Sequence, residues 1–243
     1  MKKMRIAFAL IPFLILAGCG GGGGGGDNVT VPPVTAASPP AGQQWTDVVA
    51  ATPEGGVRQG NPNAPIKLVE YGSRSCPVCG RFALEGVEQL RAKYVSTGRV
   101  SYEFRDFFVH PQDLGIALLG RCVSTEAFFP VLDQMYAQQT ELNANAEQVY
   151  QTIDPRAAPL VSASAWAHGL GYVNLMKQAG ISEAKANQCL SDTKMLETIS
   201  NQLKAATEKG VSGTPSFYIN DRSVEGAYTW ALLEPQLQAA GAR

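Results

Sequence analysis

The sequence predicts an α/β domain with a long helical segment inserted between its strands. Ile66–Tyr71 has strand composition, Gly72–Ser75 breaks it, and Arg81–Leu90 has helical spacing. A second strand-like run, Arg99–Phe104, is followed by about 100 residues of helical signals before Pro215 restores strand character. The 243-residue chain therefore suits one domain with an insertion, or two closely packed subdomains.

Three stretches of the inserted segment have apolar residues three and four positions apart: Leu114–Val123, Ala127–Gln138 and Met195–Ala206. Asp192 is placed to cap the last of these helices, and Gly210 is placed to end it. We interpret the Met and Phe residues of these stretches as core, and we expect no cofactor.

The C-terminal part returns to strands and ends in a helix. Because Pro215 follows Gly213 and Thr214 and precedes apolar alternation, it fits a cis-proline loop leading into a strand; the alternative is a trans proline at an ordinary strand start. We expect Arg222–Glu225 to form a short edge strand. A final helix is expected over Trp230–Ala240, with Pro235 setting or denting its first turn.

The first residues have the layout of a secretory signal. Lys2, Lys3 and Arg5 precede an apolar run, Ile6–Leu16, that is too short to anchor the chain across a bilayer. Leu16–Cys19 resembles the lipobox of bacterial lipoproteins. The resemblance implies that residues 1–18 are removed and that Cys19 becomes the lipid-modified N-terminus; the alternative is an ordinary signal peptide with a chance cysteine.

Residues 19–44 are expected to form a lipid-anchored linker ahead of a domain that covers 45–243 and has its helical insertion at about 111–209. The glycines of Gly20–Gly26 and the prolines that follow cannot bury a core. We expect the protein in the periplasm, with the lipid as its only link to the membrane. Gly20 stands where an aspartate would be associated with inner-membrane retention, which favours the outer membrane.

Charge excludes one class of partner. The predicted signal contains Lys2, Lys3 and Arg5 and no acidic residue, so its removal changes the formal net charge from −1 to −4. This mild acidity argues against nucleic acid as a partner.

Cys76–Cys79 is interpreted as a redox-active dithiol. Cys76 is expected at a helix N-terminus, where backbone N–H groups and the helix dipole favour a thiolate, which makes that sulfur a nucleophile and a good leaving group. Cys79 would then be the shielded thiol that resolves the reaction.

Two further cysteines, Cys122 and Cys189, complete an even number once Cys19 is assigned to lipid. Disulfides are permitted in an exported protein, and four cysteines allow three pairings. Pairing of Cys76 with Cys79 leaves Cys122 with Cys189, on two expected helices. Two buried free thiols are the alternative.

The chain resembles the DsbA-like branch of the thioredoxin superfamily between about Gly56 and Ala240. The resemblance rests on Gly60–Pro65, on Glu70–Ser73 leading into Cys76–Cys79, on Phe104–Phe107 and on Gly213–Pro215. It implies a thioredoxin-like fold with an inserted helical domain and thiol–disulfide exchange with exported proteins. A further redox partner would recycle the dithiol.

The resemblance also implies roles for three supporting residues. Pro215 would pack against the dithiol, and the backbone of Thr214 would pair with an extended substrate peptide. Glu70 matches the family's buried acid beneath the active site, with a proposed role in proton transfer for Cys79. The alternative for Glu70 is a carboxylate paired with a cation such as Arg105.

Val78 departs from the histidine that precedes the second cysteine in many strongly oxidising members. An uncharged side chain offers no cation to the thiolate, so we predict a higher Cys76 pKa and a less oxidising couple than in those members. Arg74 compensates in part if it lies beside the sulfur, and does nothing if it is an exposed loop cation.

The sequence offers little support for a metal site. His110 and His168 are its two histidines, neither of them close in sequence to Cys76, and both are interpreted as structural or surface residues. Zinc bound by Cys76 and Cys79 would need about two more ligands, and no second CxxC or His pair supplies them.

The leading hypothesis is a lipid-anchored periplasmic enzyme that forms disulfides in exported proteins, with a monomer as the default state. A reductase or isomerase of a narrower substrate set is the alternative within the same chemistry. A non-enzymatic thioredoxin-fold adaptor or metal-handling binder is the alternative from another class.

Overall fold

The computed structural model describes residues 31–243, which contain a six-stranded mixed sheet in the order β1-β2-β4-β3-β5-β6. β3 and β4 are parallel, and the other neighbours are antiparallel. The strands are β1 (Val49–Ala51), β2 (Val57–Gln59), β3 (Ile66–Gly72), β4 (Val100–Asp106), β5 (Ser216–Ile219) and β6 (Arg222–Val224).

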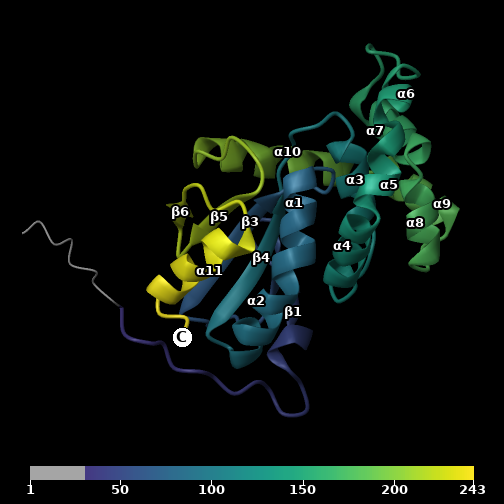
Figure 1. The fold of residues 1–243 in the computed structure, drawn as a ribbon. Coiled ribbons are helices and arrows are strands. Elements are labelled where there is room, and N and C mark those ends of the chain that lie inside the picture. Colours follow the sequence, from purple (N-terminus) through teal and green to yellow (C-terminus); the bar gives the residue numbers. More distant parts are fainter. Residues whose placement is uncertain (1–30) are drawn as a thin grey trace, which may run out of the picture.

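Helices cover both faces of the sheet (Figure 1). One face carries α1 (Pro77–Phe82), its continuation through a π-helical turn into α2 (Glu88–Lys93), and α11 (Trp230–Ala239). The end of α10 (Thr193–Glu208) lies on the other face, where Val69 and Tyr71 pack with Ala206. β3 is therefore buried on both sides, and Lys67 is the one exposed residue in it.

The helical domain lies between β4 and β5 in sequence and has a hydrophobic core of its own. α10 joins this domain to the sheet, since Ile199 packs in the helical core while Ala206 packs on the strands. The remaining helices are α3 (Asp113–Gly120), α4 (Phe128–Ala137), α5 (Gln139–Leu142), α6 (Ala146–Tyr150), α7 (Pro159–Gly169), α8 (Tyr172–Gln178) and α9 (Glu183–Leu190).

Cys122 and Cys189 form a disulfide that links the residues after α3 to α9, across a sequence separation of 67 residues. The expected Asp192 cap is present, because the Asp192 carboxylate accepts a hydrogen bond from the backbone N–H of Met195. Gly210 follows α10 with a φ of +94°, a conformation that glycine adopts without steric cost.

Some expectations need correction. Pro235 lies inside α11, which begins at Trp230, and not in its first turn. The β1–β2 hairpin and the individual helices α5 to α8 were not expected. β1 and β2 have only three residues each, too few for a periodic pattern to identify them.

The described part of the predicted linker, residues 31–44, has no helix or strand but lies against the domain. The backbone N–H of Val34 donates to Gly241, that of Ala37 donates to Thr97, and the indole of Trp45 donates to the Ala37 carbonyl. The predicted linker therefore contacts the domain at Val34 and Ala37.

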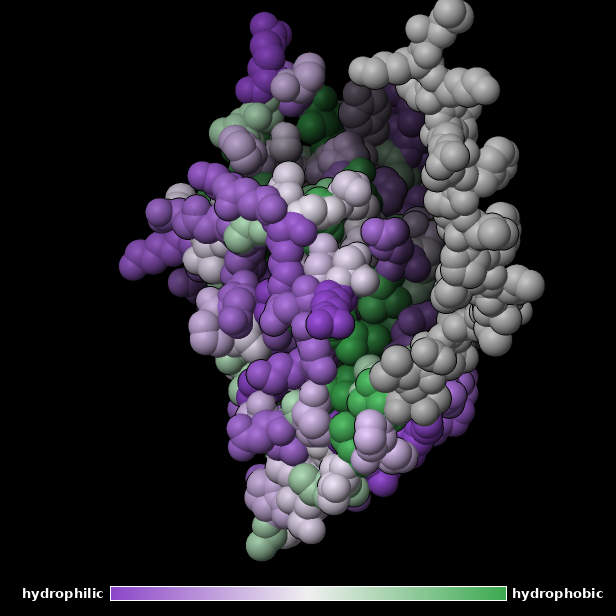
Figure 2. Space-filling view, turned by 90° about the vertical axis from the view of Figure 1, so that its left-hand side faces the viewer, coloured by the Kyte–Doolittle hydropathy of each residue, from purple (hydrophilic) through white to green (hydrophobic). Residues whose placement is uncertain are grey.

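Cys19 and the expected signal lie outside the described residues. Within residues 31–243, no helix has the length and hydropathy needed to cross a membrane. Figure 2 shows the side on which β6 and α11 lie, where hydrophilic residues predominate and hydrophobic residues gather in one stripe.

Candidate active site

Cys76 is the residue immediately before α1, at the end of a short loop that leaves β3. Pro77 occupies the first helical position, where its fixed φ suits the helix and its missing N–H costs nothing. Cys76 is 6% exposed and Cys79, one turn into α1, is fully buried. Both thiols are free.

The two thiols have opposite electrostatic environments. The hydrogen bond from Cys79 is the largest influence that lowers the pKa of Cys76, to about 5. Burial opposes this shift, whereas the Thr214 side chain and the N–H groups of Cys79 and Val78 add to it. The pKa of Cys79 is raised well above its ordinary value, first by burial and then by its hydrogen bond to Cys76. Cys76 is therefore the thiolate of the pair.

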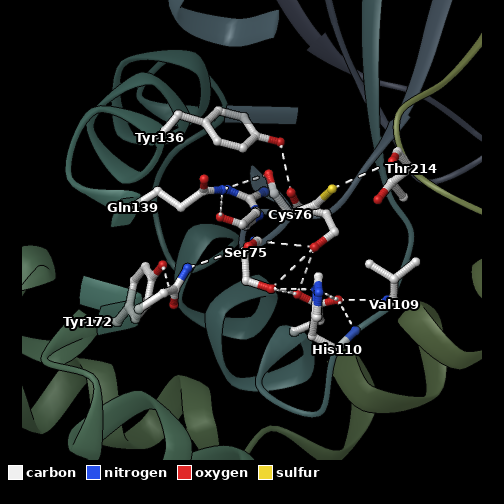
Figure 3. Close-up of polar contacts among 12 residues, drawn as sticks. Ser75, Cys76, Val109, His110, Tyr136, Gln139, Tyr172 and Thr214 are labelled. Carbon is white, nitrogen blue, oxygen red and sulfur yellow. Dashed lines mark hydrogen bonds and ion pairs between the residues drawn. The ribbon is translucent and has the colours of Figure 1, made fainter. Parts of the chain in front are cut away.

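The loop before β5 lies beside the Cys76 sulfur. The Thr214–Pro215 peptide bond is cis, and the Cys76 Sγ lies 3.5 Å from the Thr214 carbonyl oxygen, to which the thiol donates when it is protonated. β5 starts at Ser216 and pairs with β3, which brings residues some 140 positions apart into one site because of the sheet register. Figure 3 shows Thr214 on the opposite side of Cys76 from the helical domain.

Glu70 is buried beneath this site and is not paired with Arg105. The hydroxyl of Tyr102 donates to Glu70 at 2.6 Å. Arg105 stands opposite Tyr71 in the β3–β4 register, and so points to the other face of the sheet, where it contacts Glu103. Burial is the main cause that raises the pKa of Glu70, to about 8; the Tyr102 hydrogen bond opposes it.

The Arg74 side chain is buried, and its ion pair is with Asp106 and not with the Cys76 sulfur. Its side chain is 1% exposed, and its guanidinium Nε donates to Asp106 at 2.7 Å. The guanidinium also lies over the rings of Phe104 and Phe128, and Asp106 accepts a second arginine, Arg121. Arg74 thus fixes the loop to the core through its buried ion pair with Asp106.

A second carboxylate ties the loop to the start of α3. Asp113 accepts the hydroxyls of Ser73 and Ser75, together with the backbone N–H groups of Val109 and His110. His110, interpreted as structural or surface, has Nδ1 3.1 Å from the Ser75 hydroxyl (Figure 3). The contact between this loop and the segment before α3 follows from the parallel pairing of β3 and β4, because segments that follow parallel neighbours meet at the same edge of the sheet.

Three side chains of the helical domain also reach the loop: Tyr136, Gln139 and Asn143. No local sequence pattern indicates these contacts. Among residues 31–243, no group of three or more His, Cys, Asp or Glu side chains is placed to hold a metal ion.

Comparisons with known proteins agree with this architecture. Residues 52–239 match a family model described as Thioredoxin. The structure of a protein-disulfide isomerase from Novosphingobium aromaticivorans superposes with a TM-score of 0.71 at 29% identity, over 75% of this chain and 95% of that one. Wolbachia pipientis alpha-DsbA1 has a similar fold, with a TM-score of 0.57 at 24% identity, over 76% of this chain and 91% of that one.

A curated relative from Rickettsia typhi, provisionally named a protein-disulfide oxidoreductase, is 29% identical over 171 residues, or 68% of this chain. The chain spans 55% of the length of that relative. Because the family model covers most of the chain, the chain belongs to the thioredoxin superfamily, and its fold, with an inserted helical domain, is DsbA-like.

Proposed function

We propose that this protein is a thiol–disulfide oxidoreductase that exchanges disulfides with exported proteins in the direction that forms them. The observation that carries the proposal is the contrast between Cys76 and Cys79. One thiol has a pKa of about 5 and the other a raised pKa, and the first lies beside the cis-proline loop. A thiolate at neutral pH next to a protonated, buried thiol is the arrangement that disulfide exchange requires.

In the oxidising direction, the oxidised protein holds a Cys76–Cys79 disulfide. A substrate thiolate attacks the Cys76 sulfur, a new bond joins substrate to Cys76, and the Cys76–Cys79 bond breaks. The electron pair of that bond goes to Cys79, which takes up a proton because its burial disfavours the thiolate.

A second substrate thiolate then attacks the substrate sulfur of the mixed disulfide. The substrate disulfide forms and Cys76 leaves as a thiolate, which its low pKa makes a good leaving group. Two substrate thiols are oxidised, and the Cys76–Cys79 disulfide is reduced by two electrons to the dithiol. A separate redox partner must reoxidise it, and attack by Cys79 instead would release the substrate unchanged.

Supporting residues have roles in these steps. Glu70, with a pKa of about 8, holds a proton at neutral pH and is suited to supply it to Cys79. The Thr214 carbonyl, next to Pro215 and 3.5 Å from the Cys76 sulfur, is placed to accept a backbone N–H of an extended substrate.

We also propose that the protein is anchored by lipid on Cys19 and acts as a monomer in the periplasm, at the outer membrane. The lipobox-like Leu16–Cys19 supports the anchor. Substitution Cys19→Ala should release the protein from the membrane fraction on cell fractionation, and retention there would contradict the proposal.

A reductase or isomerase is the second candidate. Val78 supplies no cation, and a Cys76 pKa of about 5 lies above the value of about 3.5 in the strong oxidant DsbA. The Novosphingobium structure is also named an isomerase.

The reduction potential of the Cys76–Cys79 couple in glutathione buffers, with the full chain, tests these alternatives. A value near roughly −120 mV would indicate a strong oxidase, and one near −200 mV or below would favour a reductase or isomerase. A disulfide that resists reduction and does not exchange with peptide thiols would contradict the enzyme and favour an adaptor.

A further inference from the structure

The active-site loop is held by a row of side chains from the helical domain. Tyr136 lies in α4, Gln139 begins α5 and Asn143 lies in the turn that follows, at spacings of three and four residues. These spacings place the three side chains on one face of a helical run. That face meets the four-residue loop Ser73–Cys76.

Each backbone carbonyl of Ser73–Cys76 accepts a hydrogen bond from this face. The Tyr136 hydroxyl donates to Ser73 at 3.2 Å. The Gln139 amide donates to Arg74 at 2.9 Å and to Cys76 at 3.0 Å, and Asn143 reaches Ser75 at 3.5 Å. Figure 3 shows Tyr136 and Gln139 directed at the loop from the helical domain.

Gln139 is the centre of the row. Its side chain is 4% exposed, and its two amide hydrogens match two carbonyl acceptors, one from Arg74 and one from Cys76. A Cβ added at Gly80 of α1 would clash with Gln139 Oε1, so the amide lies directly against the helix that Cys76 precedes. No water is needed to satisfy these buried carbonyls.

The electrostatic consequence concerns the Cys76 sulfur. Carbonyl oxygens carry partial negative charge and oppose a nearby thiolate, and donors bound to them offset that charge. The same bonds fix the loop so that the N–H groups of Val78 and Cys79 face the sulfur, where both stabilise the thiolate.

We propose that Tyr136, Gln139 and Asn143 are positioning residues, through which the helical domain sets how strongly Cys76 is held as a thiolate and how oxidising its couple is. The inference deepens the proposed exchange function and rests on it for its biological meaning. The effect of the helical domain on the acidity and the potential of Cys76 can be measured without any protein substrate.

The test substitutes Gln139→Met, which keeps an unbranched side chain of similar length and removes both donors. The full chain carries Cys19→Ser in every variant, so that Cys76 and Cys79 are the free thiols. Ultraviolet absorbance of the thiolate gives the Cys76 pKa, and glutathione buffers give the potential. Gln134→Met is the matched control, since Gln134 is exposed on α4 and its side chain has no bond to the loop.

We expect Gln139→Met to raise the Cys76 pKa by about one unit, a tenfold effect on the thiolate equilibrium. The potential should become more negative by about 30 mV, the equivalent of tenfold for a two-electron couple. Gln134→Met should leave both values unchanged. Tyr136→Phe, which removes one hydroxyl and keeps the ring, should shift both values in the same direction by less.

The other titratable groups around the loop are the same in all these variants, apart from the Tyr136 hydroxyl in Tyr136→Phe: Glu70, Arg74, Cys79, His110 and Asp113. A folded Gln139→Met with the parent pKa and potential would overturn the proposal. If Gln139→Met does not fold, an unshifted Tyr136→Phe overturns it. A parent protein without exchange activity but with the expected shifts would instead contradict the proposed function alone.

Discussion

The molecule has two pairs of cysteines whose surroundings differ in every respect that controls sulfur chemistry. Cys76 and Cys79 are three residues apart, lie at a helix N-terminus against the cis-proline loop and are free. Cys122 and Cys189 are 67 residues apart, join two parts of the helical domain and are bonded. Hydrogen bonds from Cys79, Thr214 and the backbone N–H groups of Val78 and Cys79 favour the Cys76 thiolate.

The comparison separates a free dithiol suited to exchange from a disulfide that constrains the chain. In the Cys76–Cys79 pair, local hydrogen bonds lower the pKa of Cys76, and burial is the main cause that keeps Cys79 protonated. The structural pair acts through loop closure, since it limits the conformations of the unfolded chain. Position in the fold, and not residue type, assigns the two roles.

The largest expected effect comes from the reactive pair. Cys76→Ser should abolish exchange with a thiol-containing peptide, because the attacked sulfur is gone. Cys79→Ser should let Cys76 form mixed disulfides that cannot be resolved internally, and non-reducing electrophoresis would detect them. Unchanged turnover in Cys76→Ser would contradict the assignment.

Removal of the structural pair should have the converse effect. The double variant Cys122→Ala and Cys189→Ala should lower the free energy of unfolding by about 4 kcal/mol, the loop-closure value for a bridge of this span. Exchange rates at a temperature where the variant is folded should match the parent. Denaturant unfolding measures the first quantity, and loss of exchange in the folded variant would show that the two pairs are coupled.

Glu70 sharpens the comparison through pH. Its pKa rises from 4.5 to about 8 on folding, so its stabilising effect is complete below pH 4.5 and is lost as the pH rises toward 8. Between these limits the parent should lose up to about 1.4 kcal/mol per pH unit relative to Glu70→Gln, which stays neutral.

Denaturant unfolding of both reduced proteins across this pH range gives the difference. Cys76 has the opposite sign, because its depressed pKa contributes stability that is lost as the pH falls through about 5. Because the parent and Glu70→Gln both contain Cys76, this contribution is common to them. Parallel stability curves for the parent and Glu70→Gln would contradict a raised Glu70 pKa.

Local sequence patterns predicted the elements that present the dithiol. Composition predicted the strand, the break and the helix around Cys76. It also predicted the Asp192 cap and the proline before β5. Each depends on a few neighbouring residues. The cysteine count predicted the Cys122–Cys189 pairing only after Cys76 and Cys79 were paired.

Contacts between distant segments could not be predicted in this way. Arg74 is buried because Asp106 and two aromatic rings surround it, and nothing in the loop sequence indicates that cage. Gln139 and His110 reach the loop only after the helical domain docks. Helical spacing identifies a buried face, but it does not say which backbone carbonyls a polar residue on that face will meet.

The smallest expected effect comes from Val78, the half-buried residue between the two cysteines. Val78→His places an imidazole with an ordinary pKa of about 6.5 beside the sulfur, so it is cationic where Cys76 titrates. The cation should lower the Cys76 pKa below about 5 and make the couple more oxidising, because it stabilises the reduced form. Val78→Asn is the control, because asparagine is polar like histidine but has no charge. Equal pKa values in the two variants would mean that hydrogen bonds around the loop, and not charge at this position, determine the acidity of Cys76.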